Sequence, residues 1–189
     1  MQVRVWLMAA LTLLSVASMP SDGSARQTAD VEKYCAMLHS LDDAERETAR
    51  AELVKIGRPA VWAVIAVLGR DQVYLGREGA AVVLGRIRDE RAVKPLIAAL
   101  KDDYAAVREQ ASSALVLIGG TKTVDAVLEA LARGGSDPFL EAAASTLGLL
   151  GDKRALPALE KLEKHASQDV AKAATEAVAR LRSPKASSK

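Results

Sequence analysis

An apolar block recurs five times along this chain at nearly constant spacing, and this recurrence constrains the fold more than any other feature. The blocks begin at residues 53, 84, 115, 147 and 178, so the successive steps are 31, 31, 32 and 31 residues. A near-constant period of this size is typical of stacked-repeat architectures, in which each repeat is one supersecondary unit. The first residues of the blocks are Leu53, Leu84, Leu115, Leu147 and Val178.

Each block lies inside a pattern with helical period. An alanine stands four residues before each block, and Ile or Leu stands three residues after its start, which puts these positions on one face of a helix. Alanine lets neighbouring helices approach closely without loss of helix propensity. We name this predicted helix the A helix of each repeat. The five alanines are Ala49, Ala80, Ala111, Ala143 and Ala174.

A second apolar pattern of helical spacing follows each of the first four blocks after a short turn, and we name it the B helix. Pro59, Pro95 and Pro157 fall in its first turn, where a missing N–H costs little. The same offsets, applied upstream, predict a lone B helix from about residue 28 to residue 40, and residues 168–182 form a lone A helix. The sequence therefore predicts an all-α solenoid of about four helix pairs plus an N-terminal and a C-terminal capping helix.

The segments LGRIRDERAVKPL (84–96) and LGLLGDKRALPAL (147–159) carry a family resemblance. With them, residues 28–182 resemble HEAT-like repeats, especially the short type named after phycobilisome lyases. The resemblance implies a right-handed superhelix with A helices on the convex side and B helices on the concave side. Repeat solenoids commonly bind a partner on the concave surface. Fold alone does not assign a function, because such repeats serve many roles.

The first 25 residues resemble a secretory signal peptide. Arg4 gives a positive start, residues 5–17 are mostly apolar, and small residues follow as far as Ala25. Cleavage after Ala17, Ser18 or Ala25 fits this pattern, and we favour Ala25. An uncleaved membrane anchor is the alternative, although the apolar run is shorter than the roughly 20 residues a spanning helix needs. We expect an exported protein, periplasmic or secreted, with a disordered tail at 183–189.

Composition and charge exclude several classes of function. Aromatic residues make up 3% of the chain, too few for a base-stacking platform, and the formal net charge is only +2. A nucleic-acid surface built on Lys94, Lys101 and nearby cations is diluted by neighbouring acids. His39 and His165 are too far apart in sequence to predict a metal site. We therefore expect no nucleic acid, no metal, no cofactor and no catalytic residue.

An Arg–Glu pair recurs at the start of the first three A helices. Glu near a helix start is favoured by the helix dipole, and each Arg is expected to pair with an acid of an adjacent turn, such as Asp89 or Asp102. We name the arginines of these three pairs the Arg ladder and interpret the pairs as structural. Leu140 and Ala171 replace the Arg in the last two repeats. The paired positions are Arg46/Glu47, Arg77/Glu78 and Arg108/Glu109.

Four residues on B helices are candidate binding residues: Trp62, Lys94, Asp125 and Lys101. Trp62 aligns with Lys94 and Asp125 in the repeat register, at a position that is otherwise polar, and exposed Trp is enriched at binding hot spots. Because Trp is usually mostly buried, the competing interpretation is that Trp62 covers a seam near the N-terminal end, and this interpretation is preferred.

The function that we expect is that of an exported, non-enzymatic, monomeric scaffold that binds a protein partner. The alternative is an enzyme or subunit of the phycobilisome-lyase type that handles a chromophore. Cys35 is the only cysteine. It cannot form an intramolecular disulfide, and we expect it to be buried as a small hydrophobe rather than to link two chains.

Overall fold

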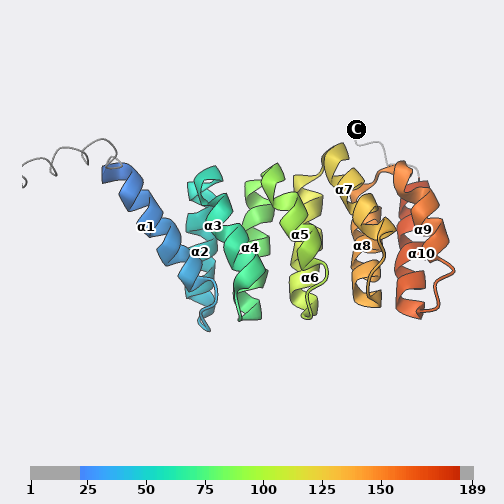
Figure 1. The fold of residues 1–189 in the computed structure, drawn as a ribbon, viewed down its shortest axis with the longest axis horizontal. Coiled ribbons are helices and arrows are strands. Elements are labelled where there is room, and N and C mark those ends of the chain that lie inside the picture. The colour runs from blue at the N-terminus through green and yellow to red at the C-terminus, as the bar shows by residue number, and fades with distance from the viewer. Residues whose placement is uncertain (1–21, 184–189) are drawn as a thin grey trace, which may run out of the picture. The chain divides into compact units, whose positions relative to one another are not determined.

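The computed structural model describes residues 22–183, and every regular element in that range is helical (Figure 1). The chain divides into two compact units, residues 1–30 and residues 31–189. Of the first unit, residues 22–30 are described, and they form the beginning of helix α1 (Asp22–Met37). The predicted export signal falls largely on residues 1–21 and the predicted tail largely on residues 184–189, all outside the described residues. Within the described range, no helix is long and apolar enough to cross a membrane.

The second unit contains two layers of helices that correspond to the predicted A and B helices (Figure 1). Successive A helices contact one another, and each B helix packs on the A helix that follows it. The A helices are α2 (Asp43–Ile56), α4 (Tyr74–Ile87), α6 (Ala105–Ile118), α8 (Asp137–Leu150) and α10 (Gln168–Arg182). The B helices that follow α2, α4, α6 and α8 are α3 (Val61–Arg70), α5 (Val93–Ala99), α7 (Gly120–Ala132) and α9 (Leu156–Leu162).

Short 3₁₀ helices lead into three of the B helices: η1 (Arg58–Ala60), η2 (Glu90–Ala92) and η3 (Lys153–Ala155). The predicted α-solenoid of four pairs between a lone B helix and a lone A helix is confirmed. The bounds of the lone B helix differ from the expected 28–40. It begins at Asp22, because Ala25, Arg26 and Gln27 are good helix formers. It ends at Met37, where tighter bonds from Leu38 N to Cys35 O and from Ser40 N to Met37 O close the last turn.

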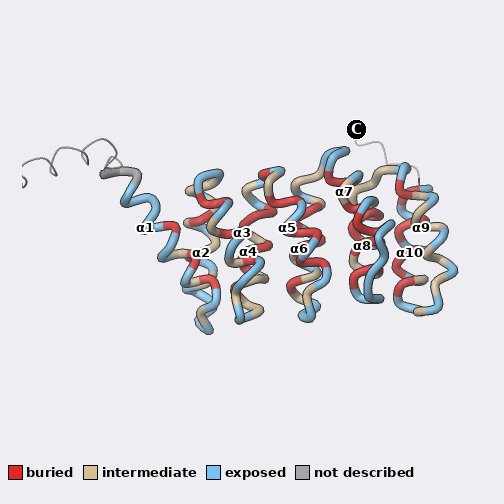
Figure 2. The backbone as a smooth tube through the Cα atoms, in the orientation of Figure 1, coloured by how far each residue is buried: buried red, intermediate tan, exposed pale blue. Residues whose placement is uncertain are grey.

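The core follows the repeat register (Figure 2). The five block residues and the five alanines four positions earlier are buried in every repeat, with at most 2% exposure. On the B helices, Val93, Leu96, Ile97 and Leu100 are all buried, as their spacing predicts. Burial of each such aliphatic side chain stabilises the fold by roughly 1.5–3 kcal/mol before conformational entropy is subtracted.

The seams between A helices are of two kinds. A Cβ atom on Gly85 of α4 would lie 2.7 Å from the Cα of Ala114 on α6, and one on Gly148 of α8 would lie 2.8 Å from the Cα of Ala177 on α10. Only glycine permits these close approaches. In the seam between α6 and α8 the equivalent residues are Val116 and Thr146.

The seam between α6 and α8 also contains a groove of about 500 Å³, lined by residues of both helices. Its buried side holds a hydrogen bond between the hydroxyls of Ser112 and Thr146, 2.8 Å apart, and Thr146 Oγ1 donates to the carbonyl oxygen of Ala142. The alternation of glycine with β-branched residues therefore makes the stacking of the repeats uneven.

The Arg ladder closes the turns between B and A helices. Nη1 of Arg46, Arg77 and Arg108 donates in each case to the carbonyl oxygen six residues earlier, at 2.6, 2.8 and 2.8 Å. Arg77 also forms the expected pair with Asp102, whereas Asp89 pairs with residues outside the ladder. In the fourth repeat the buried Leu140 takes the place of the Arg.

Candidate binding surface

The B helices expose the same two positions in each repeat. Trp62, Lys94, Asp125 and Pro157 occupy the first position, and all four are exposed. One turn later the exposed residues are Ala66, Ala98, Glu129 and Lys161. The alignment that suggested the candidate binding residues therefore describes one continuous face of the B layer.

Trp62 on α3 is 62% exposed, so the expectation that this side chain is mostly buried is wrong. The B-helix register places it one residue after the buried Val61. The guanidinium carbon of Arg91 lies 5.4 Å from the centroid of the indole. This distance is within the range of a cation–π contact, which holds one face of the ring and leaves the rest open to a ligand.

Arg91 is itself fixed by Asp89. Its Nε and Nη2 donate to the two carboxylate oxygens of Asp89 at 2.8 and 2.9 Å, and Nη2 also donates to the carbonyl oxygen of Arg58 at 3.0 Å. Arg58 Nε approaches the same carboxylate at 3.1 Å. Asp89 is buried and is thus shared by two guanidinium groups, one from each of two successive repeats.

This environment lowers the pKa of Asp89 well below its usual range. The side-chain hydrogen bond from Arg91 is the largest cause, and the backbone N–H of Arg91 and the charges of both arginines act in the same direction against the opposing effect of burial. Asp152 and Arg154 repeat the arrangement in η3, and hydrogen bonding by Arg154 likewise lowers the pKa of Asp152. The spacing Asp-x-Arg, present in both turns, is the sequence signal that could have identified Asp89 and Arg91.

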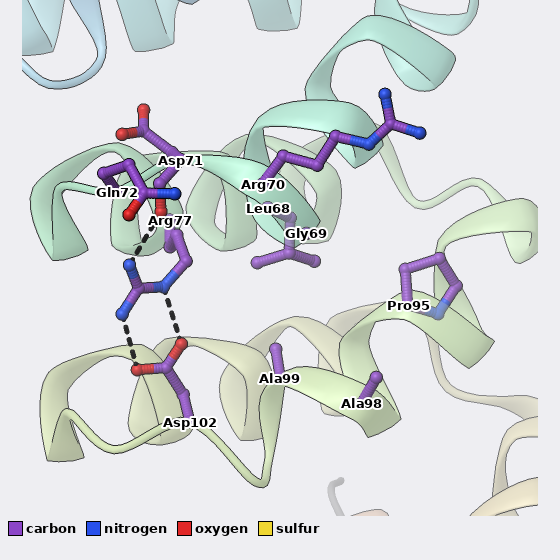
Figure 3. A pocket seen from close by; sticks show the side chains of 10 residues that line it. All are labelled: Leu68, Gly69, Arg70, Asp71, Gln72, Arg77, Pro95, Ala98, Ala99 and Asp102. Carbon is purple, nitrogen blue, oxygen red and sulfur yellow. Dashed lines mark hydrogen bonds and ion pairs between the residues drawn. The ribbon is translucent and has the colours of Figure 1, made fainter.

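A groove of about 590 Å³ lies between α3 and α5 (Figure 3). Five of its ten lining residues are small or apolar, and Arg70, Asp71 and Gln72 add polar groups. Arg77 and Asp102 close one end with hydrogen bonds of 2.7 and 3.0 Å. Figure 3 shows the side chain of Arg70 extending away from this closed end. The apolar and small residues of the lining are Leu68, Gly69, Pro95, Ala98 and Ala99.

Arg70 lines this groove, and Lys94 and Lys101 adjoin the lining residues Pro95 and Asp102 in the chain. The acid Asp71 also lines the groove, with its carboxylate 3.2 Å from His39 Nδ1. Helices α3 and α5 contain no acidic residue. Within the described part of the chain, no acid pairs with Arg70, Lys94 or Lys101; the ammonium of Lys101 lies 4.9 Å from the ring centroid of Phe139. We name Trp62, Ala66, Gly69, Arg70, Lys94, Ala98 and Lys101 the α3–α5 surface.

The structure therefore brings three of the four candidate residues together on the α3–α5 surface: Trp62, Lys94 and Lys101. Asp125 lies on α7, where its carboxylate is paired with Arg154 Nη1 at 2.6 Å. Arg70 and Arg91 are additional members of the site region that the sequence interpretation did not include. Whether any of these residues binds a ligand stays a prediction.

Three side chains of types used in covalent or metal chemistry, Cys35, His39 and His165, are either buried or hydrogen-bonded to other groups. Burial, assisted by the charge of Glu32, raises the pKa of the Cys35 thiol to about 11, which disfavours the nucleophilic thiolate. His39 Nδ1 lies 3.2 Å from Asp71, and His165 Nδ1 accepts from the backbone N–H of Ser167. The described residues include no cluster of three or more side chains able to hold a metal ion.

Comparisons with known proteins agree with the repeat pattern. The family model described as HEAT repeats matches residues 31–116, 62–142 and 124–189. The chain is similar to the phycocyanobilin lyase subunit alpha of Picosynechococcus sp., with 39% identity over 85 residues. That match covers 41% of this chain and 31% of the relative, so the chain spans about a third of the relative's length.

Similar solved structures include designed repeat proteins. An engineered protein is 19% identical, covers 87% of each chain and has a TM-score of 0.46. A designed armadillo repeat protein solved in complex with the peptide (KR)4 is 18% identical, covers 84% of each chain and has a TM-score of 0.42.

Proposed function

Because the chain belongs to the family of HEAT repeats, we propose that it is a non-enzymatic scaffold that binds a protein partner through its B-helix layer. The observation that carries this proposal is Trp62, which is 62% exposed and held on one face by Arg91. A large, partly fixed aromatic side chain loses little entropy on binding and is a frequent anchor of protein interfaces. The family resemblance implies that the B helices line the concave side, where repeat solenoids commonly bind.

The proposal is tested by affinity capture with three immobilised proteins: wild type, Trp62→Ala and Leu149→Ala. Leu149 is the matched control, because it is a large apolar residue, 48% exposed, on the A helix α8. We expect wild type and Leu149→Ala to retain the same protein from the envelope fraction of the source cells. Trp62→Ala should weaken its binding by about 2 kcal/mol or more, roughly 30-fold in Kd.

Melting temperatures of the three proteins serve as the control for folding. Retention of the same partner, with unchanged affinity, by Trp62→Ala would contradict the proposal. Loss of the partner in both variants would instead assign binding to a surface that includes α8.

We also propose that the protein is exported. Support comes from Arg4, the apolar run at 5–17 and the small residues that end at Ala25. Mass spectrometry of the protein recovered from the source cells should find a new N-terminus after Ala17, Ser18 or Ala25. Recovery of an intact N-terminus would contradict cleavage and favour the anchor.

A second candidate function is the handling of a bilin chromophore, and the relative named phycocyanobilin lyase subunit alpha favours it. Against it, the only cysteine has a buried thiol with a pKa raised to about 11. Titration with phycocyanobilin, followed by its visible absorbance, separates the two candidates. A saturable spectral shift at micromolar protein would support chromophore handling, whereas an unchanged spectrum favours the scaffold.

A further inference from the structure

We propose that the partner of the α3–α5 surface is an acidic, extended segment of a protein, bound with carboxylates at both ends of the groove and a side chain on Trp62. This inference rests on the proposed scaffold function and specifies the chemistry of its partner. It is carried by the distribution of paired and unpaired charge on the B layer.

The unpaired charge on this part of the B layer is positive. Arg70, Lys94 and Lys101 have no carboxylate within ion-pair distance among the described residues. Arg91, which contacts the ring of Trp62, shares the single carboxylate of Asp89 with Arg58. This group of two arginines and one aspartate therefore carries one net positive charge. The side chain of Arg58 is 82% exposed, so this excess charge is accessible to a ligand.

The acidic groups on the adjacent helix are already neutralised. Asp125 on α7 pairs with Arg154, and Glu129 pairs with Arg133. Asp102, at the closed end of the groove, accepts two hydrogen bonds from Arg77. Each of these carboxylates has a cationic partner, and Asp71, the other acid that lines the groove, lies 3.2 Å from His39 and accepts from the backbone N–H of Val73. The three cations of the α3–α5 surface have no carboxylate partner among the described residues. The unpaired charge of this surface is therefore positive, and a complementary partner carries negative charge.

The two ends of the surface set the spacing of the partner's acids. Trp62 and Lys94 lie near the N-terminal ends of α3 and α5. Arg70 is the last residue of α3, and Lys101 follows the last residue of α5 by two positions. Trp62 and Arg70 are eight residues apart on one helix, a rise of about 12 Å. An extended chain covers this distance with about four residues. We therefore expect acidic residues about four positions apart in the partner.

The floor between these ends admits a peptide backbone. Ala66, Gly69 and Ala98 are small and exposed, and an added Cβ on Gly69 would meet nothing within 4 Å. None of these three positions carries a side chain longer than a methyl group. A peptide lying here would contact the small residues through its backbone and the cations through its side chains.

A nucleic acid fits these observations less well. The surface offers one exposed indole, whereas single-stranded nucleic acids are usually bound on several aromatic side chains. The formal net charge of the chain is +2, too small to provide the long positive track that a phosphate backbone requires. An acidic peptide needs only the few local cations that the surface provides.

The test measures binding of two fluorescein-labelled peptides, octaglutamate and octalysine, and of labelled oligo(dT) to the full chain. The variants are Arg70→Glu/Lys94→Glu and, as a control with the same change in net charge, Arg86→Glu/Lys172→Glu. Arg86 and Lys172 are exposed residues of the A helices α4 and α10. Fluorescence anisotropy at low and high salt gives each Kd.

We expect wild type and the control variant to bind octaglutamate more tightly than octalysine, with binding that weakens as salt rises. Arg70→Glu/Lys94→Glu should bind octaglutamate at least tenfold more weakly and reverse the preference towards octalysine. Equal loss in the control variant would overturn the proposal, because it would show a response to net charge alone. Oligo(dT) binding tighter than octaglutamate binding would also overturn it.

The capture experiment separates this proposal from the scaffold function. A partner that depends on Trp62 but binds Arg70→Glu/Lys94→Glu as tightly as wild type would overturn the acidic segment and leave the scaffold intact. A partner insensitive to Trp62→Ala would contradict the scaffold function itself.

Discussion

Asp89 shows at the scale of a single residue how one turn is joined to the next. The buried carboxylate accepts hydrogen bonds from Arg91 N, Nε and Nη2 within its own turn, and from Arg58 Nε in the turn of the preceding repeat. A buried charge is stable only when it is paired in this way. Asp89 is therefore a structural acid that positions Arg91, and through it one face of Trp62.

This pairing makes stability depend on pH. Because the folded state lowers the pKa of Asp89 below the usual 3.8, the stabilisation is complete above the unfolded pKa and is lost as pH falls through the lower folded value. We expect the melting temperature to fall on acidification below about pH 4. Asp89→Asn should lower the stability at pH 7 by about 1–2 kcal/mol and flatten this acid dependence.

The matched control for Asp89→Asn is Glu90→Gln, since Glu90 is an exposed neighbour paired only with Lys122. Its effect should be within about 0.5 kcal/mol at every pH. Calorimetric melting curves of both variants and wild type from pH 2 to 7 make the comparison. An acid dependence of Asp89→Asn as steep as that of wild type would show that other carboxylates are responsible.

Cys35 is a second residue whose ionisation and accessibility depend on the fold. The thiol is buried in the second unit beside the equally buried Val31 and Leu38, and its pKa is raised to about 11. At neutral pH the thiolate is therefore scarce and shielded. We expect reaction with a thiol-specific reagent to be at least about 100-fold slower in the native protein than in urea, since thiolate fraction and access both control the rate. Comparable rates in the two states would show that Cys35 is accessible and restore the disulfide-linked dimer as an alternative.

At the scale of helices, glycine determines how closely neighbours stack. Gly85 and Gly148 permit close contact between α4 and α6 and between α8 and α10. Val116 and Thr146 stand at the corresponding places between α6 and α8. A helix pays about 1 kcal/mol for an interior glycine relative to alanine, so these glycines are retained where the space requires them.

The same substitution at two helical glycines should therefore have opposite effects. At Gly85 an added Cβ would meet backbone and Cβ atoms of Ala114 at 2.7 and 2.8 Å, so Gly85→Ala should destabilise by about 1–3 kcal/mol. At Gly69 the Cβ would meet nothing, and Gly69→Ala should stabilise by up to about 1 kcal/mol. Urea denaturation of the two variants measures both signs. A stabilising Gly85→Ala would mean that the α4–α6 seam can open without cost.

At the scale of the whole molecule, contacts run mainly between neighbouring repeats. In such an array the free energy of unfolding is a sum of repeat and interface terms, and a defect in one repeat acts first on its neighbours. This arrangement distinguishes a solenoid from a domain with one central core.

Leu147→Ala tests this locality. Leu147 is fully buried in α8, and its truncation should destabilise by about 2–5 kcal/mol. Hydrogen exchange should accelerate in α8, α9 and α10, while protection in α2 and α3 changes little. The control is Leu149→Ala on the exposed side of the same helix. An equal loss of protection in all helices would show instead that the unit unfolds as one cooperative body.

The sequence by itself determined the repeat period, the alternation of A and B helices and the residues of the core. These depend on local spacing: apolar residues at helical intervals must share a face, and the same interval in five repeats predicts stacking. The buried alanines from Ala49 to Ala174 and the lone helix at residues 168–182 were predictable for this reason.

Only the tertiary structure decided which polar groups of one repeat meet those of the next. Arg58 and Asp89 are 31 residues apart, and Asp125 and Arg154 are 29 apart. The register places such residues near each other, but the choice among charged partners depends on side-chain conformation and on the depth of each site. For this reason the sequence did not predict the exposure of Trp62, the cation on its ring or the cations that lack a carboxylate.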